Sequence, residues 1–586
     1  MEENTLLQPG ENGTMEYTAA GVGDARVALF SALVRSCTAE RVIDLLESCL
    51  VNNDVSALVD VIVLLFQTRH CRGGKGERTL FYTMFWRIAE MLPETCCDLV
   101  ALVPHYGSYK DLFQLLAHKE QAAAATAVGV VQQHIVMFLA ETLLDDFVKL
   151  SFDQSEDVTV SVDVPGDDEV AVSVEVNDNA NVEVSVETDK AKKEKAAQVS
   201  LCAKYAPREK GHFAKGPNKW IYTRLTTAMF SENTSQRRAE YRRVVSALRK
   251  HLDIVEVKMA ANRYGDIDYT KLPSVCTLKH RKAFLNEGRR RSHSEDRVKG
   301  RERFLEAIAS EQIKGSQVFP HTIVQALRKK IKKMSPEEKA LLDVQWRDLR
   351  SRVKGLRNMV AMVDVSGSMD GTPMEVAMAL GLLTSEVAEG PFRNRVLTFD
   401  SNPTWVTFDD AMTIADKVML LGNAPWGAST NFIKAMRLLL FELIQDKSSS
   451  SEKQRTDLLV LSDMQFDAAA SDGGVVFKKE LSTQPMLDTI ATMFEDAGLP
   501  VPRIIFWNLR GDTRGFVAQH DSPNVQLLSG FSPALLKLVT DQEGDFDTRK
   551  PITPYETFRL AVDDAAYDPV RDVLRASDEG RLALYA

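Results

Sequence analysis

The segment from residue 358 to about residue 545 constrains the fold most, because strand-like and helix-like runs alternate along it. Short runs of branched apolar residues predict strands, and longer runs with apolar residues three and four apart predict helices. The expected strands are Met359–Val363, Val396–Phe399, Trp405–Phe408, Leu458–Leu461, Ile504–Trp507 and Val525–Leu528. The expected helices are Pro373–Val387, Phe432–Ile444, Met486–Ala497 and Ser532–Val539. This alternation is typical of an α/β domain with a doubly wound, mainly parallel, Rossmann-like sheet.

Oxygen-bearing side chains follow the predicted strands of this domain. Asp364, Ser366 and Ser368 come directly after the first strand in DVSGSM, and Asp463 ends the string LLVLSD. Thr430 lies in WGAST, just before a predicted helix. In such sheets, ligands bind outside the carboxyl ends of the strands. Because carboxylate and hydroxyl oxygens suit hard cations, the five residues predict a site for Mg2+ (or Mn2+).

The order Asp-x-Ser-x-Ser, then Thr, then Asp resembles the metal-ion-dependent adhesion site (MIDAS) of von Willebrand factor A (vWA) domains. The resemblance implies that Ser366, Ser368 and Thr430 are direct ligands of the metal. Asp364 and Asp463 would then act mostly through water or serine. It also implies a protein partner whose acidic residue completes the metal site.

The region before this domain is expected to be α-helical and repeat-like. Apolar residues recur at helical spacing in Ala25–Leu50, Val55–Gln67, Glu77–Met91 and Gln121–Leu150, with short Gly- or Pro-containing breaks between them. The glycine-rich break around Lys75 is not a phosphate-binding P-loop, because Gly76 follows the lysine where Ser or Thr is required. A turn between helices is the better interpretation, from which Arg72 and Lys75 could still touch a phosphate.

An acidic insert interrupts the helical region. Residues 153–189 contain no Lys or Arg, and valines alternate with acidic residues along parts of the stretch. Disorder is the favoured interpretation, and a hairpin turning at Asn177–Asn179 is the alternative. The predicted divisions are a disordered N-terminus (1–24), a helical module (25–150), the acidic low-complexity insert (151–198), a basic helical module (199–356), the vWA domain (357–545) and a C-terminal extension (546–586) that packs back as short helices.

Positive charge is concentrated in and around the basic module. Residues 190–357 hold 41 Lys and Arg against 18 Asp and Glu, although the whole chain has a formal net charge of −10. Such an excess is compatible with phosphate-bearing partners, although any one charge run is more often the solvated face of a helix. Residues 289–291 would also suit a nuclear localisation signal. The predicted nucleic-acid-binding residues are Arg237, Arg238, Arg242, Arg243, Arg289, Arg290, Arg291, Lys329 and Lys330.

Five strings along the chain resemble a domain-of-unknown-function (DUF) family in which a helical region precedes a vWA domain. They are GGKGERTLFY, PHYGSYKDL, CAKYAPREK, LSDMQFD and FWNLRG, and the resemblance covers most of residues 25–570. Ala428 departs from it, because that family is expected to have glycine there. The domain order and basic charge are also similar to the Ro ribonucleoprotein, in which helical repeats of the TROVE module bind RNA, a likeness of architecture alone.

These observations favour a non-enzymatic, metal-dependent binding scaffold. The vWA domain would bind a protein partner through Mg2+, and the basic helices would bind structured or single-stranded RNA in a Ro-like manner. A protein–protein adaptor with no nucleic-acid role is the alternative, and a metal-dependent hydrolase is the third hypothesis. No catalytic triad or zinc-binding motif can be argued from the spacing. Seven unpatterned cysteines and a polar N-terminus favour a cytoplasmic protein, with the nucleus as the alternative and no membrane contact.

Overall fold

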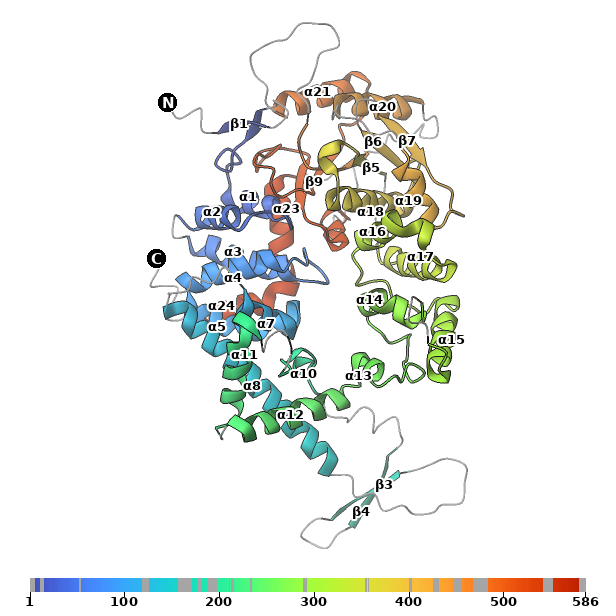
Figure 1. Cartoon of the computed structure of the whole chain (residues 1–586). Coiled ribbons are helices and arrows are strands. Elements are labelled where there is room, and N and C mark those ends of the chain that lie inside the picture. The colour runs from blue at the N-terminus through green and yellow to red at the C-terminus, as the bar shows by residue number, and fades with distance from the viewer. Residues whose placement is uncertain are drawn as a thin grey trace. The chain divides into compact units, whose positions relative to one another are not determined.

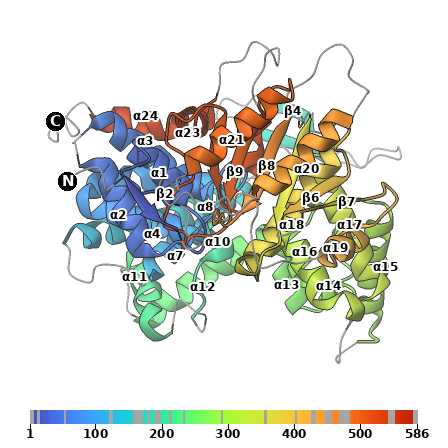
Figure 2. The ribbon, with the colours of Figure 1, turned by 90° about the horizontal axis from the view of Figure 1, so that it is seen from above.

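The computed structural model of the chain is shown in Figures 1 and 2. It describes residues 6–10, 15–51, 54–118, 126–155, 171–176, 182–187, 198–209, 211, 215–231, 234–287, 292–353, 356, 358–399, 403–424, 432–445, 456–466, 483–540 and 552–578. The chain forms two compact units, unit 1 of residues 1–88 and 263–586, and unit 2 of residues 89–262. This division differs from the predicted boundaries at 150 and 356, because the first and last helices of the chain pack with the α/β domain.

A six-stranded sheet lies at the centre of unit 1, with strand order β10-β9-β8-β5-β6-β7. The five strands from β10 to β6 are parallel, and β7 is antiparallel to β6 at the edge. All residues of β5 and β8 are buried, which explains why both strands are uninterrupted apolar runs in the sequence. The predicted mainly parallel sheet is therefore confirmed. The strands are β5 (Met359–Asp364), β6 (Arg395–Phe399), β7 (Thr404–Thr407), β8 (Asp457–Ser462), β9 (Arg503–Asn508) and β10 (Val525–Ser529).

Helices cover both faces of this sheet. On one face lie α20 (Phe432–Gln445) and α21 (Thr483–Asp496), as Figure 2 shows. Their residues Phe432, Met436 and Ile490 are buried against strand residues. On the other face, α18 (Thr372–Val387) packs so closely on β5 that a Cβ at Gly381 would lie 2.4 Å from Cγ2 of Val363. These helices lie close to the predicted ranges. The predicted Ser532–Val539 helix is split into a 3-10 turn, Pro533–Leu536, and α22 (Lys537–Thr540).

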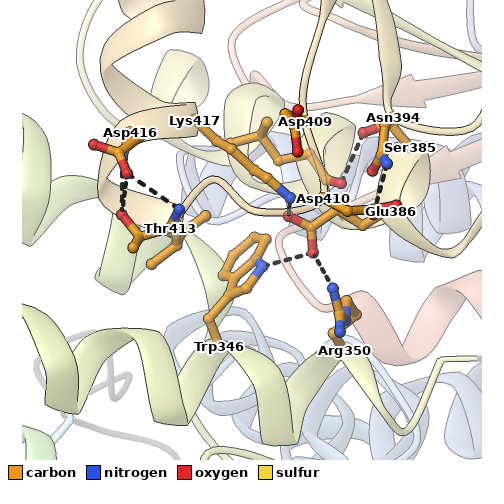
Figure 3. A network of polar contacts seen from close by, with 12 residues as sticks. Trp346, Arg350, Ser385, Glu386, Asn394, Asp409, Asp410, Thr413, Asp416 and Lys417 are labelled. Carbon is orange, nitrogen blue, oxygen red and sulfur yellow. Dashed lines mark hydrogen bonds and ion pairs between the residues drawn. The ribbon is translucent and has the colours of Figure 1, made fainter.

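Helices that precede the sheet in sequence pack on its α18 side. In Figure 1, α16 (Pro320–Lys330) and α17 (Pro336–Arg350) lie beside α18 and α19 (Ile414–Gly422). Glu386 of α18 is buried where they meet (Figure 3), and it accepts hydrogen bonds from Lys417 Nζ at 2.8 Å and Trp346 Nε1 at 3.0 Å. The last part of the predicted basic module therefore shares a buried polar cluster with the α/β domain. Unit 1 also contains α14 (Ser274–Phe284) and α15 (Glu295–Ala309).

The first and last helices of the chain pack together within unit 1. Asp60 of α3 binds Arg26 of α1 at 2.8 Å and Arg559 of α23 at 2.7 Å, so a single carboxylate joins three helices. The C-terminal helices α23 and α24 pack back on α3. The helices are α1 (Ala25–Ala32), α2 (Ala39–Leu50), α3 (Val55–Arg69), α4 (Thr79–Met91), α23 (Pro554–Val562) and α24 (Asp568–Asp578).

Three expectations for the N-terminal segment are wrong for the described residues. Residues 25–50 form two helices instead of one, because the Thr38 side chain caps a new helix by accepting from Arg41 N. The predicted disordered N-terminus contains β1 (Leu7–Pro9) and β2 (Met15–Tyr17), and Tyr17 exchanges two backbone hydrogen bonds of 2.9 Å with Phe516. Lys75 is fully buried and donates to the carbonyl oxygens of Phe30 and Leu33, so it cannot contact a phosphate.

Unit 2 is built around α8, whose apolar face packs on α5, α11 and α12. The stretch Ala127–Ser151 of α8 is long and apolar enough to cross a membrane by length and composition, a test that a core helix also passes. In the acidic insert, β3 (Ala171–Val176) pairs antiparallel with β4 (Val182–Glu187), so these twelve residues follow the hairpin alternative and not the favoured disorder. The helices are α5 (Pro93–Leu99), α6 (Val103–Tyr106), α7 (Tyr109–Ala117), α8 (Thr126–Ser155), α10 (Cys202–Tyr205), α11 (Lys219–Met229), α12 (Thr234–His251) and α13 (Val255–Ala260).

Candidate metal site at the carboxyl edge of the sheet

The strand order places two carboxylates at one point of the sheet. From β5 the chain continues to β6 on one side, and it later returns to β8 on the other side, so the order reverses between β5 and β8. Asp364 is the last residue of β5, and Asp463 directly follows β8. Open α/β sheets bind their ligands at such reversal points, outside the carboxyl ends of the strands.

Asp364 is fully buried and is held by two donors. Its Oδ1 accepts from the Ser366 backbone N–H at 2.9 Å, and its Oδ2 accepts from the Ser462 hydroxyl at 2.6 Å. Ser366 is buried as well, whereas Ser368 is exposed, and their hydroxyl oxygens lie 3.0 Å apart. The loop after β5 therefore presents two adjacent hydroxyls between a buried carboxylate and the solvent.

Asp463 is also fully buried, and one of its oxygens is poorly satisfied. Oδ1 accepts from the Gln465 backbone N–H at 3.3 Å, while Oδ2 has no hydrogen-bond partner among the described residues. The Arg510 guanidinium is 3.5 Å from Oδ2, close enough to attract the carboxylate but without hydrogen-bond geometry. Leaving a buried charged oxygen in this state is unfavourable unless a cation approaches it.

The electrostatics of the two carboxylates depend on each other. Burial raises the pKa of Asp364 to about 7, and the nearby charge of Asp463 adds to this effect, while hydrogen bonds from Ser462 and Ser366 oppose it. Burial also raises the pKa of Asp463, against the lowering effects of Ser368, the Gln465 backbone and Arg510. Burial disfavours the ionised form of both carboxylates, and a bound divalent cation would reverse this effect because it favours the ionised form.

The structure brings together Asp364, Ser366, Ser368 and Asp463 of the predicted metal site, while Thr430 lies outside the described residues. Ser462 and Arg510 were missed by the sequence reasoning, although Ser462 adjoins Asp463 and Arg510 lies in the quoted string FWNLRG. Within the described parts of the chain, no group of three or more His, Cys, Asp or Glu could hold a metal. A metal here would therefore depend on serine hydroxyls as well as on carboxylates, which fits the donor set that is present.

The predicted nucleic-acid-binding residues are divided between the two units. Arg237, Arg238, Arg242 and Arg243 lie on α12 in unit 2, and Lys329 and Lys330 end α16 in unit 1. Residues 289–291 lie outside the described residues.

Several of these cations already have carboxylate partners. Arg242 binds Glu209 at 2.9 Å, and Lys329 lies 3.5 Å from Glu375. Their side chains nevertheless remain more than half exposed, at 58% and 62%. The Arg242–Glu209 pair is a weak surface ion pair, so Arg242 can still attract a polyanion. Glu375 is buried, and Lys329 approaches it while its own side chain stays exposed to a polyanion.

Comparisons with known proteins agree with a chain of two successive domains of unknown function. Residues 180–359 match the family described as domain of unknown function DUF2828, and residues 358–571 match the one described as domain of unknown function DUF7788. The second match begins next to β5 and includes the whole sheet. The expectation of a DUF-type protein is thus confirmed.

A relative with the same overall extent is found in a large virus. The chain is 27% identical over 548 residues to the uncharacterized protein L728 of Acanthamoeba polyphaga mimivirus. The aligned region covers 91% of this chain and 84% of that protein, so the likeness includes both the helical part and the α/β domain.

Proposed function

We propose that the chain is a non-enzymatic binding scaffold. Its α/β domain is of the vWA type and binds an acidic residue of a protein partner through Mg2+ or Mn2+, and its basic helices bind RNA. The observation that carries the metal part is the pair of fully buried carboxylates, Asp364 and Asp463, beside two serine hydroxyls at the reversal point of the sheet.

The described residues fit a divalent ion in their chemistry and in their access to solvent. Oδ2 of Asp463 is buried and accepts no hydrogen bond from a described residue, and Ser368 is exposed beside it. Ser366, Ser368 and Thr430 would hold the ion directly, while Asp364 would hold Ser366 in place through its backbone N–H. The bound cation would offer a coordination position that a partner's carboxylate could occupy.

A titration with Mg2+ and Mn2+ tests the metal part. Isothermal calorimetry of the wild-type protein should give one binding event, and Asp463→Asn should abolish it. Asp410→Asn serves as the matched control, because Asp410 is an exposed carboxylate of the same domain that pairs with Arg393. Equal binding by wild type and Asp463→Asn would overturn the proposal, and so would no binding by the wild-type protein.

RNA binding is proposed for the basic helices because their cations are exposed and concentrated. Phosphate contacts by lysine and arginine give affinity that falls steeply with salt and depends little on sequence. Filter binding of a single-stranded RNA over a range of KCl concentrations should therefore give a clear negative slope of log affinity against log salt. A flat plot would remove the RNA part of the proposal.

The alternative, a protein–protein adaptor without a nucleic-acid role, is favoured by the ion pairs of the basic helices. Glu209 lies within 4 Å of both Arg238 and Arg242, and Glu240 binds Arg243 at 2.8 Å. An acidic protein segment could replace these carboxylates as easily as RNA. If polyglutamate displaces the protein's own carboxylates from these ion pairs and RNA does not, the protein–protein adaptor replaces RNA binding as the proposed function.

A further inference from the structure

Residues 202–209, which belong to the string CAKYAPREK and lie outside the metal site, form a braced segment in unit 2. It contains α10 and the loop that follows, and buried contacts fix that loop to α12. Tyr241 Oη donates to the Pro207 carbonyl at 2.8 Å, and Arg249 donates to the carbonyls of Ala203 at 2.8 Å and Ala206 at 2.7 Å. These bonds hold the loop in one position beside the helix.

A cavity of about 420 Å³ lies between this loop and α12. Tyr241, Val245 and Val257 give it an apolar wall, and Arg208, Arg249 and Lys250 give it a cationic one. Its volume is within the usual range for small-ligand sites. The combination suits a ligand with both an apolar surface and a compact negative charge.

Three of the four cations that line this cavity lack a carboxylate partner among the described residues. Arg249 donates its hydrogen bonds to the carbonyl oxygens of Ala203 and Ala206, and Arg208 and Lys250 have no carboxylate partner among the described residues. Burial lowers the pKa of Arg249, and the nearby charge of Arg208 lowers it further. Arg242 also lines the cavity, and Glu209, the only carboxylate among the described lining residues, is bound to it at 2.9 Å.

Several positive charges around one cavity repel one another unless an anion is bound there. We propose that this cavity binds a phosphate group of single-stranded RNA, with Arg208, Arg249 and Lys250 contacting the phosphate oxygens. The apolar wall formed by Tyr241, Val245 and Val257 then faces the ribose or the base of the same nucleotide. The assignment to RNA rests on the proposed function above, whereas the preference for phosphate rests on the cavity itself.

The test compares two double variants of the full chain that remove the same charge. Arg208→Gln/Lys250→Gln removes two exposed cations of the cavity, and Lys215→Gln/Lys219→Gln removes two exposed cations of unit 2 outside its lining. Binding of a fluorescein-labelled single-stranded RNA is followed by anisotropy over a range of KCl concentrations. Unchanged melting temperatures show that both variants are folded.

The cavity variant should bind RNA roughly tenfold more weakly, as expected for loss of charged hydrogen bonds. Its salt slope should be less steep by about 0.7, the value for one phosphate contact on a single strand. The control variant should stay within about twofold of the wild type, because long-range attraction is screened by salt. Equal weakening of both variants, or of neither, would overturn the inference.

Pyrophosphate and a nucleoside 5′-monophosphate separate this inference from the proposed function. Both should displace the RNA from the wild type and bind the cavity variant more weakly. If the wild type binds pyrophosphate through the cavity but no RNA, then the RNA assignment and the proposed RNA function both fail. If RNA binds and neither small phosphate competes, the cavity is not its phosphate site and the inference fails while RNA binding stands.

Discussion

Two buried clusters of charged side chains in unit 1 differ in how their charge is balanced. In the Glu386 cluster (Figure 3), the carboxylate is paired with Lys417 at 2.8 Å and lies 3.5 Å from Arg350. At the sheet edge, Asp364 and Asp463 are both buried, and Arg510, 3.5 Å from Asp463, is the only described residue that opposes their charge. A cluster whose charges are balanced is expected to stabilise the packing of helices. A cluster with unbalanced charge lowers the stability of the fold, and a bound ligand can offset this loss.

The largest effect is expected from the balanced cluster. Lys417→Met leaves the buried Glu386 carboxylate without its closest cation and should destabilise the protein by about 3–5 kcal/mol. The midpoint of urea denaturation measures this loss of stability, and the loss should be the same with and without Mg2+. The Lys417→Met/Glu386→Gln variant is the control, since removing both charges should restore part of the stability. A loss below about 1 kcal/mol would show that the pair contributes little.

The second effect is a pH dependence that belongs to the unbalanced cluster. The pKa of Asp364 is raised to about 7, so between about pH 4 and pH 7 the folded protein binds a proton that the unfolded chain has released. Stability without metal should therefore fall as pH rises through this window, by at most about 1.4 kcal/mol per unit. Thermal melts in EDTA at several pH values measure the slope, which Asp364→Asn should reduce. If stability depends on pH with the same slope in Asp364→Asn, groups other than Asp364 cause the pH dependence.

How far the sequence alone could lead differs between these two clusters. The strands β5 and β8 were predictable because both faces are buried and their sequences are continuously apolar, and this put Asp364 and Asp463 at one edge. Glu386 gave no such signal, because its partners Trp346 and Lys417 come from other helices. Pairings of this kind depend on tertiary packing, which no local pattern encodes.

Two further features show where the local patterns were incomplete or misleading. The helix α19 was missed, although Thr413 and Asp416 form a capping box at its start that the sequence displays. Lys75 lies in a glycine-rich turn, which usually indicates exposure, yet it is buried against Ser529, from the far end of the chain. A search for caps would have found the helix, but nothing local predicts the buried lysine.

The third prediction distinguishes the stability that the buried Asp463 carboxylate costs from its role in binding the metal. Asp463→Asn removes a buried negative charge next to Asp364, so the metal-free protein should be more stable by about 1–3 kcal/mol, the usual cost of an unsatisfied buried polar group. Wild-type protein should gain melting temperature when Mg2+ is added, while the variant should not. Differential scanning calorimetry with EDTA and with Mg2+ measures both changes. A variant that is less stable in EDTA would mean that the carboxylate is structural.

The smallest effect concerns Arg510, which supplies the only positive charge next to the unbalanced cluster among the described residues. Its guanidinium lies 3.5 Å from Asp463 and donates to the Ser368 carbonyl at 3.4 Å, and Asp512 pairs with it at 2.7 Å. A cation already near the carboxylate opposes a divalent ion, so Arg510→Gln should tighten Mg2+ binding by a few-fold, the scale of a partly exposed ion pair. Arg393→Gln, which removes a charge that pairs with Asp410 instead, should leave the affinity unchanged. Weaker binding in Arg510→Gln would show that the arginine organises the metal site, and the two clusters would then differ less than their charges indicate.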